Sequence, residues 1–263
     1  MNRPFRLQRR LPRRHFLARA AAATSALWLA GCDQLSRTEW FPKVLNSVEP
    51  LNRAAAKLVG RRAMAQEFAE SDRSPTFRSN GSDDPGTPQY DAWVANGFSD
   101  YALMVGGLVA TPRKFSLAEL RALPSRTQIT RHDCVEGWSA IGEWTGVPLS
   151  YLLMQAQLKP NAKYLVFRCA DNLGQTPGET GLYYESIDLV DAFHPQTIMA
   201  YAMNGQTLPV DHGAPIRLRV ERQLGYKMAK YVMRIEAVEE FSKIALGKGG
   251  FWEDRGYEWY AGI

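Results

Sequence analysis

Several short runs of the chain are rich in Val, Tyr, Ile and Phe, and the first of them alternates in character and ends in a Gly pair; these patterns predict β-strands. The runs are "YALMVGGLV" (101–109), "AKYLVFRCA" (162–170), "PIRLRVE" (215–221) and "KYVMRIEAVEEF" (230–241), with a further short strand at 128–130. Helical spacing appears instead in "SLAELRALP" (116–124), which opens with a capping box, and in "PLSYLLMQAQL" (148–158). The order of elements predicts a mixed α+β fold with short strands and long loops.

The pattern is different ahead of these strands. From Glu39 to Glu70 apolar residues recur at helical spacing, interrupted by Pro42 and Pro50, which predicts a helical arm. We assign the arm to residues 32–74 and the main domain to residues 75–263. The stretch "SDRSPTFRSNGSDDPGTPQ" (71–89) is rich in Ser, Asp, Gly and Pro and predicts an irregular loop, which at this length is often functional.

Residues 1–31 are typical of an export signal. A basic start precedes an apolar stretch that is too short to span a bilayer comfortably. Arg13 and Arg14 stand before His-Phe-Leu, as in twin-arginine signals. The sequence "LAGC" resembles a lipoprotein processing box that would attach lipid to Cys32, and Asp33 resembles the signal that retains lipoproteins at the inner membrane. A plain signal-peptidase site, releasing a soluble periplasmic protein, is the alternative.

The basic charge of the chain is concentrated in this leader. The formal net charge is +5, yet seven arginines and no acidic residue precede Asp33. The remainder shows no basic stripe with interleaved aromatic residues, so we expect no nucleic-acid partner.

Cys134 is the residue with the most informative surroundings. With Cys32 assigned to lipid, Cys134 and Cys169 could form a disulfide in an oxidising compartment. The acidic neighbours Asp133 and Glu136 disfavour a thiolate nucleophile, whereas a bound cation would deprotonate the thiol. No second Cys or His stands at zinc-site spacing, so a metal would need further ligands from a cofactor. A buried structural cysteine is the competing interpretation.

The stretch "HDCVEGWSAIGEWTGVPLSYLL" (132–153) resembles the sulfite-oxidase-type molybdopterin domain. The nearest branch is the bacterial periplasmic one that contains the methionine-sulfoxide reductase catalytic subunit. That branch has Cys-Val-Glu-x-Trp-Ser, a Trp ten positions after the cysteine, and then Gly-x-Pro-Leu. The resemblance covers about residues 75–241 and implies the α+β fold of that domain with a molybdenum-molybdopterin cofactor. It also implies that Cys134 is the only protein ligand to molybdenum, since the pterin dithiolene supplies two further sulfurs.

Three further motifs extend the resemblance. In "NAKYLVFRCADN" Cys169 stands where the family has a pterin-contacting threonine, and "AYAMNGQTLPVDHGAPIRLRV" contains the positions that hold the pterin and its phosphate. "GYKMAKYV" is similar to a Gly-x-Lys-x-x-Lys segment with two cofactor contacts. Without the resemblance, Arg217 would be interpreted as a solvated surface arginine, His212 as a capping or core histidine, and Met228 as a core methionine. The implied cofactor-binding residues are Arg78, Ser79, Cys169, His212, Arg217, Met228 and Lys230.

The loop near the metal departs from the family. Sulfite oxidases have x-Arg-Asn-His there, and the methionine-sulfoxide reductase branch has Tyr-Glu, but this chain has "TFRSNGSDDP" (76–85). Neither substrate pocket is reproduced. We therefore take Glu136, with Cys134, as a catalytic candidate, and the pair Tyr183 and Tyr184 as pocket-shaping candidates. After Phe241 only a short aromatic tail follows, so we expect neither the haem-binding nor the dimerisation domain of animal sulfite oxidases.

These features predict oxygen-atom transfer at molybdenum outside the cytoplasm. Reduction of an S- or N-oxide is the first expectation, and sulfite oxidation is the second. Because no cysteine is left for an iron–sulfur cluster, electrons are expected from a membrane haem partner. We expect a monomer. A non-catalytic envelope lipoprotein that keeps the fold is the rival from another class.

Overall fold

The computed structural model describes residues 63–174 and 181–263, together with positions 37–41, 43–44, 47–48, 51 and 54–55. The export signal and Cys32 lie outside the described residues. The chain divides into two compact units, residues 1–59 and 60–263. In the first unit, the described positions from 40 to 55 are helical. No helix within the described ranges is both long and apolar enough to cross a membrane.

The second unit contains all the strands of the described chain. Each run with strand periodicity forms a strand, and both helical patterns after residue 100 form helices. In chain order the elements are η1 (Glu70–Asp72), α3 (Pro88–Ala95), β1 (Ala102–Gly107), β2 (Arg113–Ser116), α4 (Leu117–Ala122), β3 (Arg126–Asp133), β4 (Ser139–Pro148), α5 (Leu149–Ala156), β5 (Tyr164–Asn172), β6 (Leu182–Asp188), α6 (Leu189–Ala192), β7 (Ile198–Met203), β8 (Gln206–Thr207), η2 (Val210–His212), β9 (Arg217–Arg219), η3 (Gly225–Lys227), β10 (Val232–Val238) and η4 (Glu253–Arg255), where η marks a 3-10 helix.

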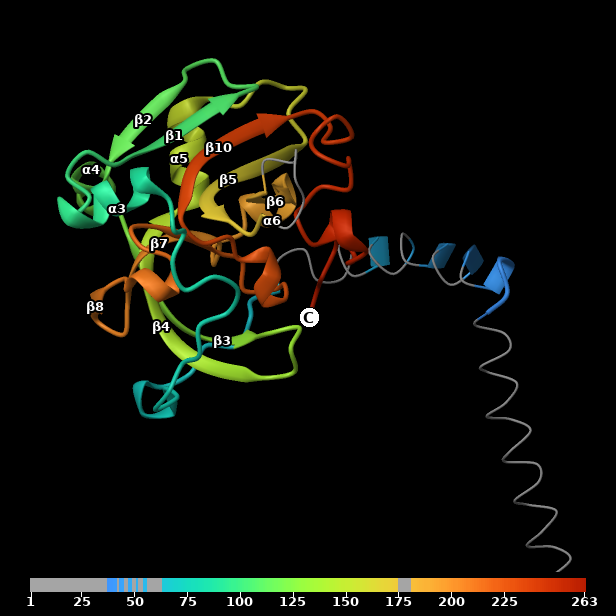
Figure 1. Ribbon diagram of the computed structural model, residues 1–263, viewed down its shortest axis with the longest axis horizontal. Coiled ribbons are helices and arrows are strands. Elements are labelled where there is room, and N and C mark those ends of the chain that lie inside the picture. Colours follow the sequence, from blue (N-terminus) through green and yellow to red (C-terminus); the bar gives the residue numbers. More distant parts are fainter. Residues whose placement is uncertain are drawn as a thin grey trace, which may run out of the picture. The chain divides into compact units, whose positions relative to one another are not determined.

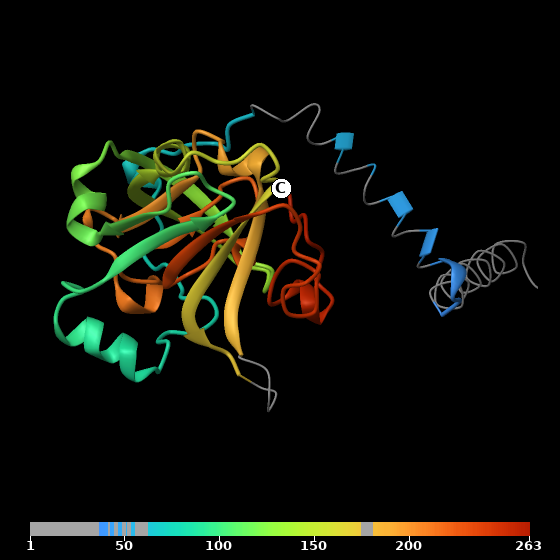
Figure 2. The same cartoon turned by 90° about the horizontal axis from the view of Figure 1, so that it is seen from above.

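The strands form two sheets (Figures 1 and 2). The first has the order β2-β1-β10-β5-β6, in which β1 and β10 are parallel and the other pairs are antiparallel. The second has the order β3-β4-β7-β8, with β9 also paired to β7, and all its pairs are antiparallel. The C-terminal segment lies beside β6, where Tyr184 donates to Asp254 and Ser186 donates to the carbonyl of Gly249.

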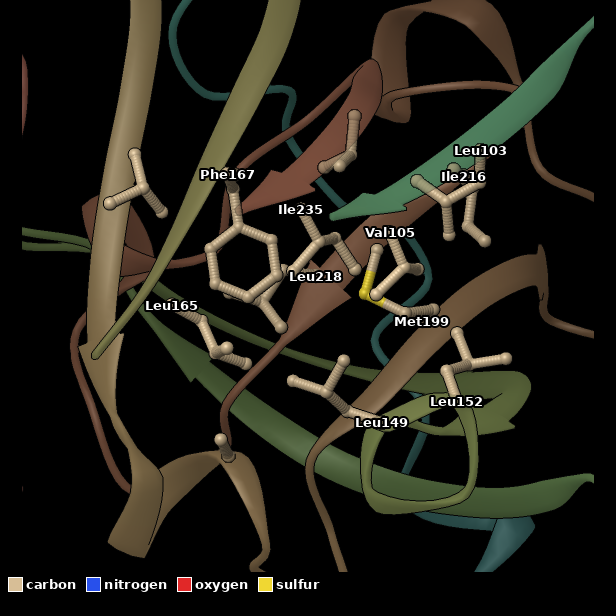
Figure 3. Packing of buried hydrophobic residues seen from close by; sticks show 14 of the residues in the cluster. Leu103, Val105, Leu149, Leu152, Leu165, Phe167, Met199, Ile216, Leu218 and Ile235 are labelled. Carbon is tan, nitrogen blue, oxygen red and sulfur yellow. The ribbon is translucent and has the colours of Figure 1, made fainter. Parts of the chain in front are cut away.

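The main hydrophobic core lies between the sheets and α5. Figure 3 shows side chains of β1, β5 and β10 pointing toward those of β7, β9 and α5. Full burial of one such aliphatic side chain contributes about 1.5–3 kcal/mol, so this core dominates the stability of the unit. Its fully buried members include Leu103, Leu149, Leu152, Leu165, Phe167, Met199, Leu218 and Ile235.

The predicted helical arm is wrong for residues 63–69, which run extended. The backbone N–H of Phe68 donates to the carbonyl of Ile129 at 2.9 Å, and Glu67 forms a bridge with Thr130. The segment therefore adds to the edge of β3, because an open strand edge offers backbone partners that outweigh a weak helical period. The loop from residue 73 is irregular as predicted, but it ends in α3, whose N-cap is Thr87.

Gly146 permits a close approach between β4 and β7. A Cβ atom at this position would lie 2.1 Å from the carbonyl oxygen of Met199 and 2.5 Å from the Cα of Ala200. The register between the two strands shifts at this point, as in a β-bulge. Because Gly146 has no side chain, β4, the strand that follows the Cys134 loop, packs directly against the backbone of β7.

We predict that Gly146→Ala lowers the free energy of unfolding by about 1–3 kcal/mol, because the clash is with backbone that cannot rotate away. Urea denaturation measures the change. Gly106→Ala is the matched control, since Gly106 is also a strand glycine and its added Cβ would meet only the Arg234 side chain at 3.8 Å. Equal destabilisation by both substitutions would contradict the close-approach argument.

Candidate active site

Cys134 occupies the loop between β3 and β4. The loop is closed by two backbone hydrogen bonds, from Cys134 N–H to Trp138 O at 2.9 Å and from Gly137 N–H to Cys134 O at 3.0 Å. Cys134 is 8% exposed and lines a cavity of about 110 Å³. The other walls of this cavity, here called the Cys134 cavity, are Asn80, Gly81, Ser82, Val135, Glu136, Asp171, Leu173, Tyr183, Gly225, Tyr226, Met228, Lys230, Trp252 and Tyr257.

The Cys134 thiol is free and is held in its protonated form. Burial, followed by the charge of Glu136, raises its pKa, while backbone N–H groups of Glu136 and Val135 partly offset the increase. Cys169 is also a free thiol, so the structure contains no Cys134–Cys169 disulfide. In the described part of the chain, no group of three or more His, Cys, Asp or Glu side chains could hold a metal ion. A metal at Cys134 would therefore take its remaining ligands from a cofactor.

Lys230 ties the loop before α3 to the rest of the site. Its ammonium donates to Ser79 Oγ at 3.3 Å, to the carbonyl of Asp211 at 2.8 Å, and to the carbonyl of Ser82. Tyr231 adds a hydrogen bond from its hydroxyl to the same Ser82 carbonyl at 3.0 Å. One wall of the Cys134 cavity thus depends on a single lysine and its neighbour.

Two fully buried arginines lie behind the cavity on the ring of Trp144. The guanidinium carbon of Arg217 is 5.0 Å from the ring centroid, and that of Arg219 is 4.3 Å from it. Arg219 makes a bidentate pair with Glu221, at 2.8 and 2.6 Å, and also contacts His132 Nδ1 at 3.0 Å. Arg217 donates only to two carbonyls, and its Nε has no hydrogen-bond partner among the described residues.

The buried cations depress one another's pKa values. Burial, followed by the charge of Arg219, lowers the pKa of Arg217 to about 9. Burial, followed by the charge of Arg217, lowers the pKa of Lys230 to about 7. A bound anion would reverse both shifts by favouring the charged forms. The unpartnered Nε of Arg217 and the lowered pKa values of two neighbouring cations fit an anion such as a pterin phosphate, so the residues present fit the cofactor that the sequence predicts.

The structure brings most of the predicted residues to this region. Cys134, Glu136, Met228 and Lys230 all line the Cys134 cavity, and Ser79 contacts Lys230. The remaining predicted residues are placed as follows. Arg217 donates to the carbonyl of His212 at 3.0 Å, His212 Nε2 is 3.2 Å from the carbonyl oxygen of Phe77, and the guanidinium carbon of Arg78 is 5.9 Å from the Trp138 ring centroid.

Cys169 is not on this cavity. It lies in the main core, 1% exposed, and lines a second cavity of about 560 Å³. Of the pocket-shaping candidates, Tyr183 lines both cavities and Tyr184 lines only the second. Glu136 is exposed and accepts a hydrogen bond from Trp138 Nε1 at 2.9 Å.

Several residues of the site carry no sequence signal of their own. Asp171 is buried in the Cys134 cavity, and the aromatic rings of Trp252 and Tyr257 bring the C-terminal tail onto the same wall. His132 is fully buried beside Arg219, and burial, followed by the charge of Arg219, lowers its pKa well below the usual range. The one hint of Asp171 that the sequence offers is a charged residue near the end of a predicted strand.

Comparison with known proteins gives consistent matches. Residues 89–245 match the oxidoreductase molybdopterin binding domain family. The chain is 43% identical over 164 residues to YedZ1 of Azospira oryzae, a subunit provisionally named for protein-methionine-sulfoxide reductase, covering 62% of this chain and 56% of the relative. It is 36% identical over 153 residues to the protein-methionine-sulfoxide reductase catalytic subunit MsrP of Xanthomonas axonopodis pv. citri, covering 56% and 48%.

The sulfane dehydrogenase SoxCD of Paracoccus pantotrophus is similar in structure, with 28% identity and a TM-score of 0.48 over 54% of this chain and 39% of that chain. The chain spans about half the length of the curated relatives it matches. The family match itself covers more than half of this chain and includes Cys134, Arg217 and Lys230. The chain belongs to the oxidoreductase molybdopterin binding domain family, as the motif around Cys134 predicts.

Proposed function

We propose that the protein is a molybdopterin-dependent oxidoreductase that reduces an S- or N-oxide outside the cytoplasm. The observation that carries the proposal is the position of one free thiol, Cys134, in a cavity that Lys230 also lines, with the buried Arg217 donating to the carbonyl of the cavity residue Met228. When bound, the cofactor supplies a two-electron centre for oxygen-atom transfer. Cys134 would hold its metal, and His212, Arg217 and Lys230 would hold its phosphate. Arg78, Ser79, Cys169 and Met228 remain the proposed pterin contacts.

The direction of the reaction is inferred from the relatives. The names of the MsrP relatives specify methionine-sulfoxide reduction, which supports a neutral oxide as substrate. Sulfite oxidation is the second candidate, because Arg78 lies over the Trp138 ring next to Cys134, in the loop where sulfite oxidases carry an arginine.

The first test uses protein exported from a host that makes molybdopterin. We expect the wild type to contain molybdenum and to oxidise a reduced viologen dye when dimethyl sulfoxide, methionine sulfoxide or trimethylamine N-oxide is added. In Cys134→Ser the molybdenum content should fall at least about tenfold, because the metal loses its protein ligand. Met154→Ser, which changes an exposed residue of α5 outside the site, should retain its metal.

Metal analysis and the dye assay check both expectations. A Cys134→Ser protein that binds molybdenum and turns over would refute the assignment. A wild type that reduces no oxide but passes electrons from sulfite to ferricyanide would support the second candidate. A wild type without molybdenum would favour a non-catalytic envelope lipoprotein.

Lys230 gives a second test, directed at the phosphate. A charge-assisted hydrogen bond contributes about 1.5–3 kcal/mol, so Lys230→Met should weaken pterin retention by about tenfold or more. Because the pKa of Lys230 lies at about 7 without an anion, binding must take up a proton at higher pH, and retention by the wild type should decrease as the pH rises above 7. Lys230→Met should lose this dependence.

Fluorescence of the released, oxidised pterin measures retention after dialysis across this pH range. Lys163→Met serves as the control, since Lys163 is exposed and pairs only with Glu239 among the described residues. Equal loss from both variants would mean that the lysine charge acts non-specifically.

We further propose that the protein is anchored by lipid on Cys32 at the outer face of the inner membrane, after folded export by the twin-arginine route. Residues 32–74 would then act as a spacer, residues 75–263 as the catalytic domain, and a membrane haem protein as electron donor. Supporting features are the arginine pair before "HFL" and the box "LAGC".

Mass spectrometry of the mature protein tests this anchor. We expect the chain to begin at Cys32 with a diacylglycerol modification, and Cys32→Ala to release the protein from membranes. An unmodified terminus at any other residue would exclude the lipid anchor and leave a soluble periplasmic enzyme.

A further inference from the structure

Asp171, near the end of β5, is a buried carboxyl group in the Cys134 cavity. Asp171 is 4% exposed and is one of the residues that line this cavity. Oδ2 accepts a hydrogen bond from Ser82 Oγ at 2.9 Å, whereas Oδ1 has no partner among the described residues. Leaving a buried carboxylate oxygen without a hydrogen bond is costly. This favours the protonated carboxylic acid, whose Oδ1–H could donate to a substrate in the cavity.

The two carboxyl groups of the cavity lie in contrasting environments. Glu136 is exposed and already accepts the Trp138 hydrogen bond. Burial raises the pKa of Asp171 to about 6, and the Ser82 hydrogen bond and the charge of Lys230 partly offset the increase. When two acids in one site differ in this way, the buried one is suited to donate a proton near neutral pH.

The other groups that face Asp171 do not compete for this role. Its charge raises the pKa values of the phenols of Tyr90, Tyr183 and Tyr231, for each of which burial is the larger cause, so these phenols stay protonated. The same holds for the buried thiol of Cys169. Lys230 is the facing cation, and it can stabilise the carboxylate once the proton has left.

We propose that Asp171 is the proton donor of the reaction, with its Oδ1–H delivering a proton to the oxygen that leaves the substrate. The inference rests on the proposed function. Reduction of a sulfoxide to the corresponding sulfide and water consumes two electrons and two protons. Both electrons come from the external donor. As the S–O bond breaks, the oxygen takes one proton from Asp171 and the second from solvent, and the Asp171 carboxylate stays paired with Ser82.

Asp171→Asn tests the proposal in as-purified, metal-loaded protein. We expect kcat for the oxide to fall about 100-fold, the typical contribution of a general acid, with molybdenum content unchanged. The wild-type rate should decline as Asp171 deprotonates with rising pH. The rate of Asp171→Asn should not show this decline. Asp171→Glu should restore part of the rate, together with its decline at higher pH.

Infrared titration gives a readout that does not depend on turnover. The wild type should show a buried carboxylic C=O band that disappears as the pH is raised, and Asp171→Asn should lack it. Asp83→Asn is the matched control, since it makes the same substitution at an exposed residue near Lys230. It should keep the band, the rate and the pH profile.

Three outcomes would overturn the proposal. The first is wild-type kcat and pH dependence in Asp171→Asn, and the second is no difference in the infrared band. The third is loss of molybdenum in Asp171→Asn, which would make Asp171 a cofactor-binding group. If the wild type reduces no oxide at all, the proposed function fails instead, and the metal-loaded wild type shows this before any variant is made.

Discussion

Burial of two arginines against one tryptophan is the interaction on which the rest of the site depends. Arg217 and Arg219 are at most 1% exposed, and both guanidinium groups lie over Trp144. Burying a charge without a partner is costly, and of the two arginines only Arg219 pairs with a carboxylate of the described residues, that of Glu221. Arg217 is stabilised by the aromatic face and by two backbone carbonyls, which leaves positive charge in the interior.

This charge organises the segments around it. The carbonyls that accept from Arg217 belong to His212 and Met228, so one side chain fixes the turn before β9 and the turn before β10. Lys230 extends the connection to the loop before α3. Tyr231 follows with a positive φ of 52°, which is unusual for an aromatic residue and strained. The surrounding hydrogen bonds therefore maintain a backbone that would not form in isolation.

The sequence predicted the elements whose signals are local. Strands β1, β5, β9 and β10 follow from short apolar runs, and α4 follows from the capping box of Ser116 and Glu119, which the structure contains. Residues 63–69 were predicted as helix because backbone pairing with β3 leaves no mark on their periodicity. Helix α3 was not predicted, since among its eight residues only Tyr90 is buried.

The same distinction applies to the site. Cys134 and the cationic residues belong to motifs, so the sequence indicates them. Asp171 does not, because its inward position depends on β5 being buried on both faces and on an irregular register with β6 between Arg168 and Asn172. At this part of β5 the burial of side chains does not follow the alternation between the two faces of a strand. Trp144 was matched by spacing, but its role as a platform for two arginines requires the pairing of β4 with β7 and of β7 with β9.

The distribution of unsatisfied buried groups links folding to the cofactor. Among the described residues, the buried polar atoms without a hydrogen-bond partner include Oδ1 of Asp171, which lines the cavity, and Nε of Arg217, whose side chain donates to the carbonyl of the cavity residue Met228. Others, on Thr130, Glu185 and Glu253, do not line it. Each costs about 1–3 kcal/mol in a protein that has nothing to pair it. A ligand that pairs even some of them binds the folded state alone and stabilises it by mass action. A chain of this kind gains most from folding around its cofactor where the cofactor is made, and the proposed twin-arginine route, which carries folded proteins, matches that requirement.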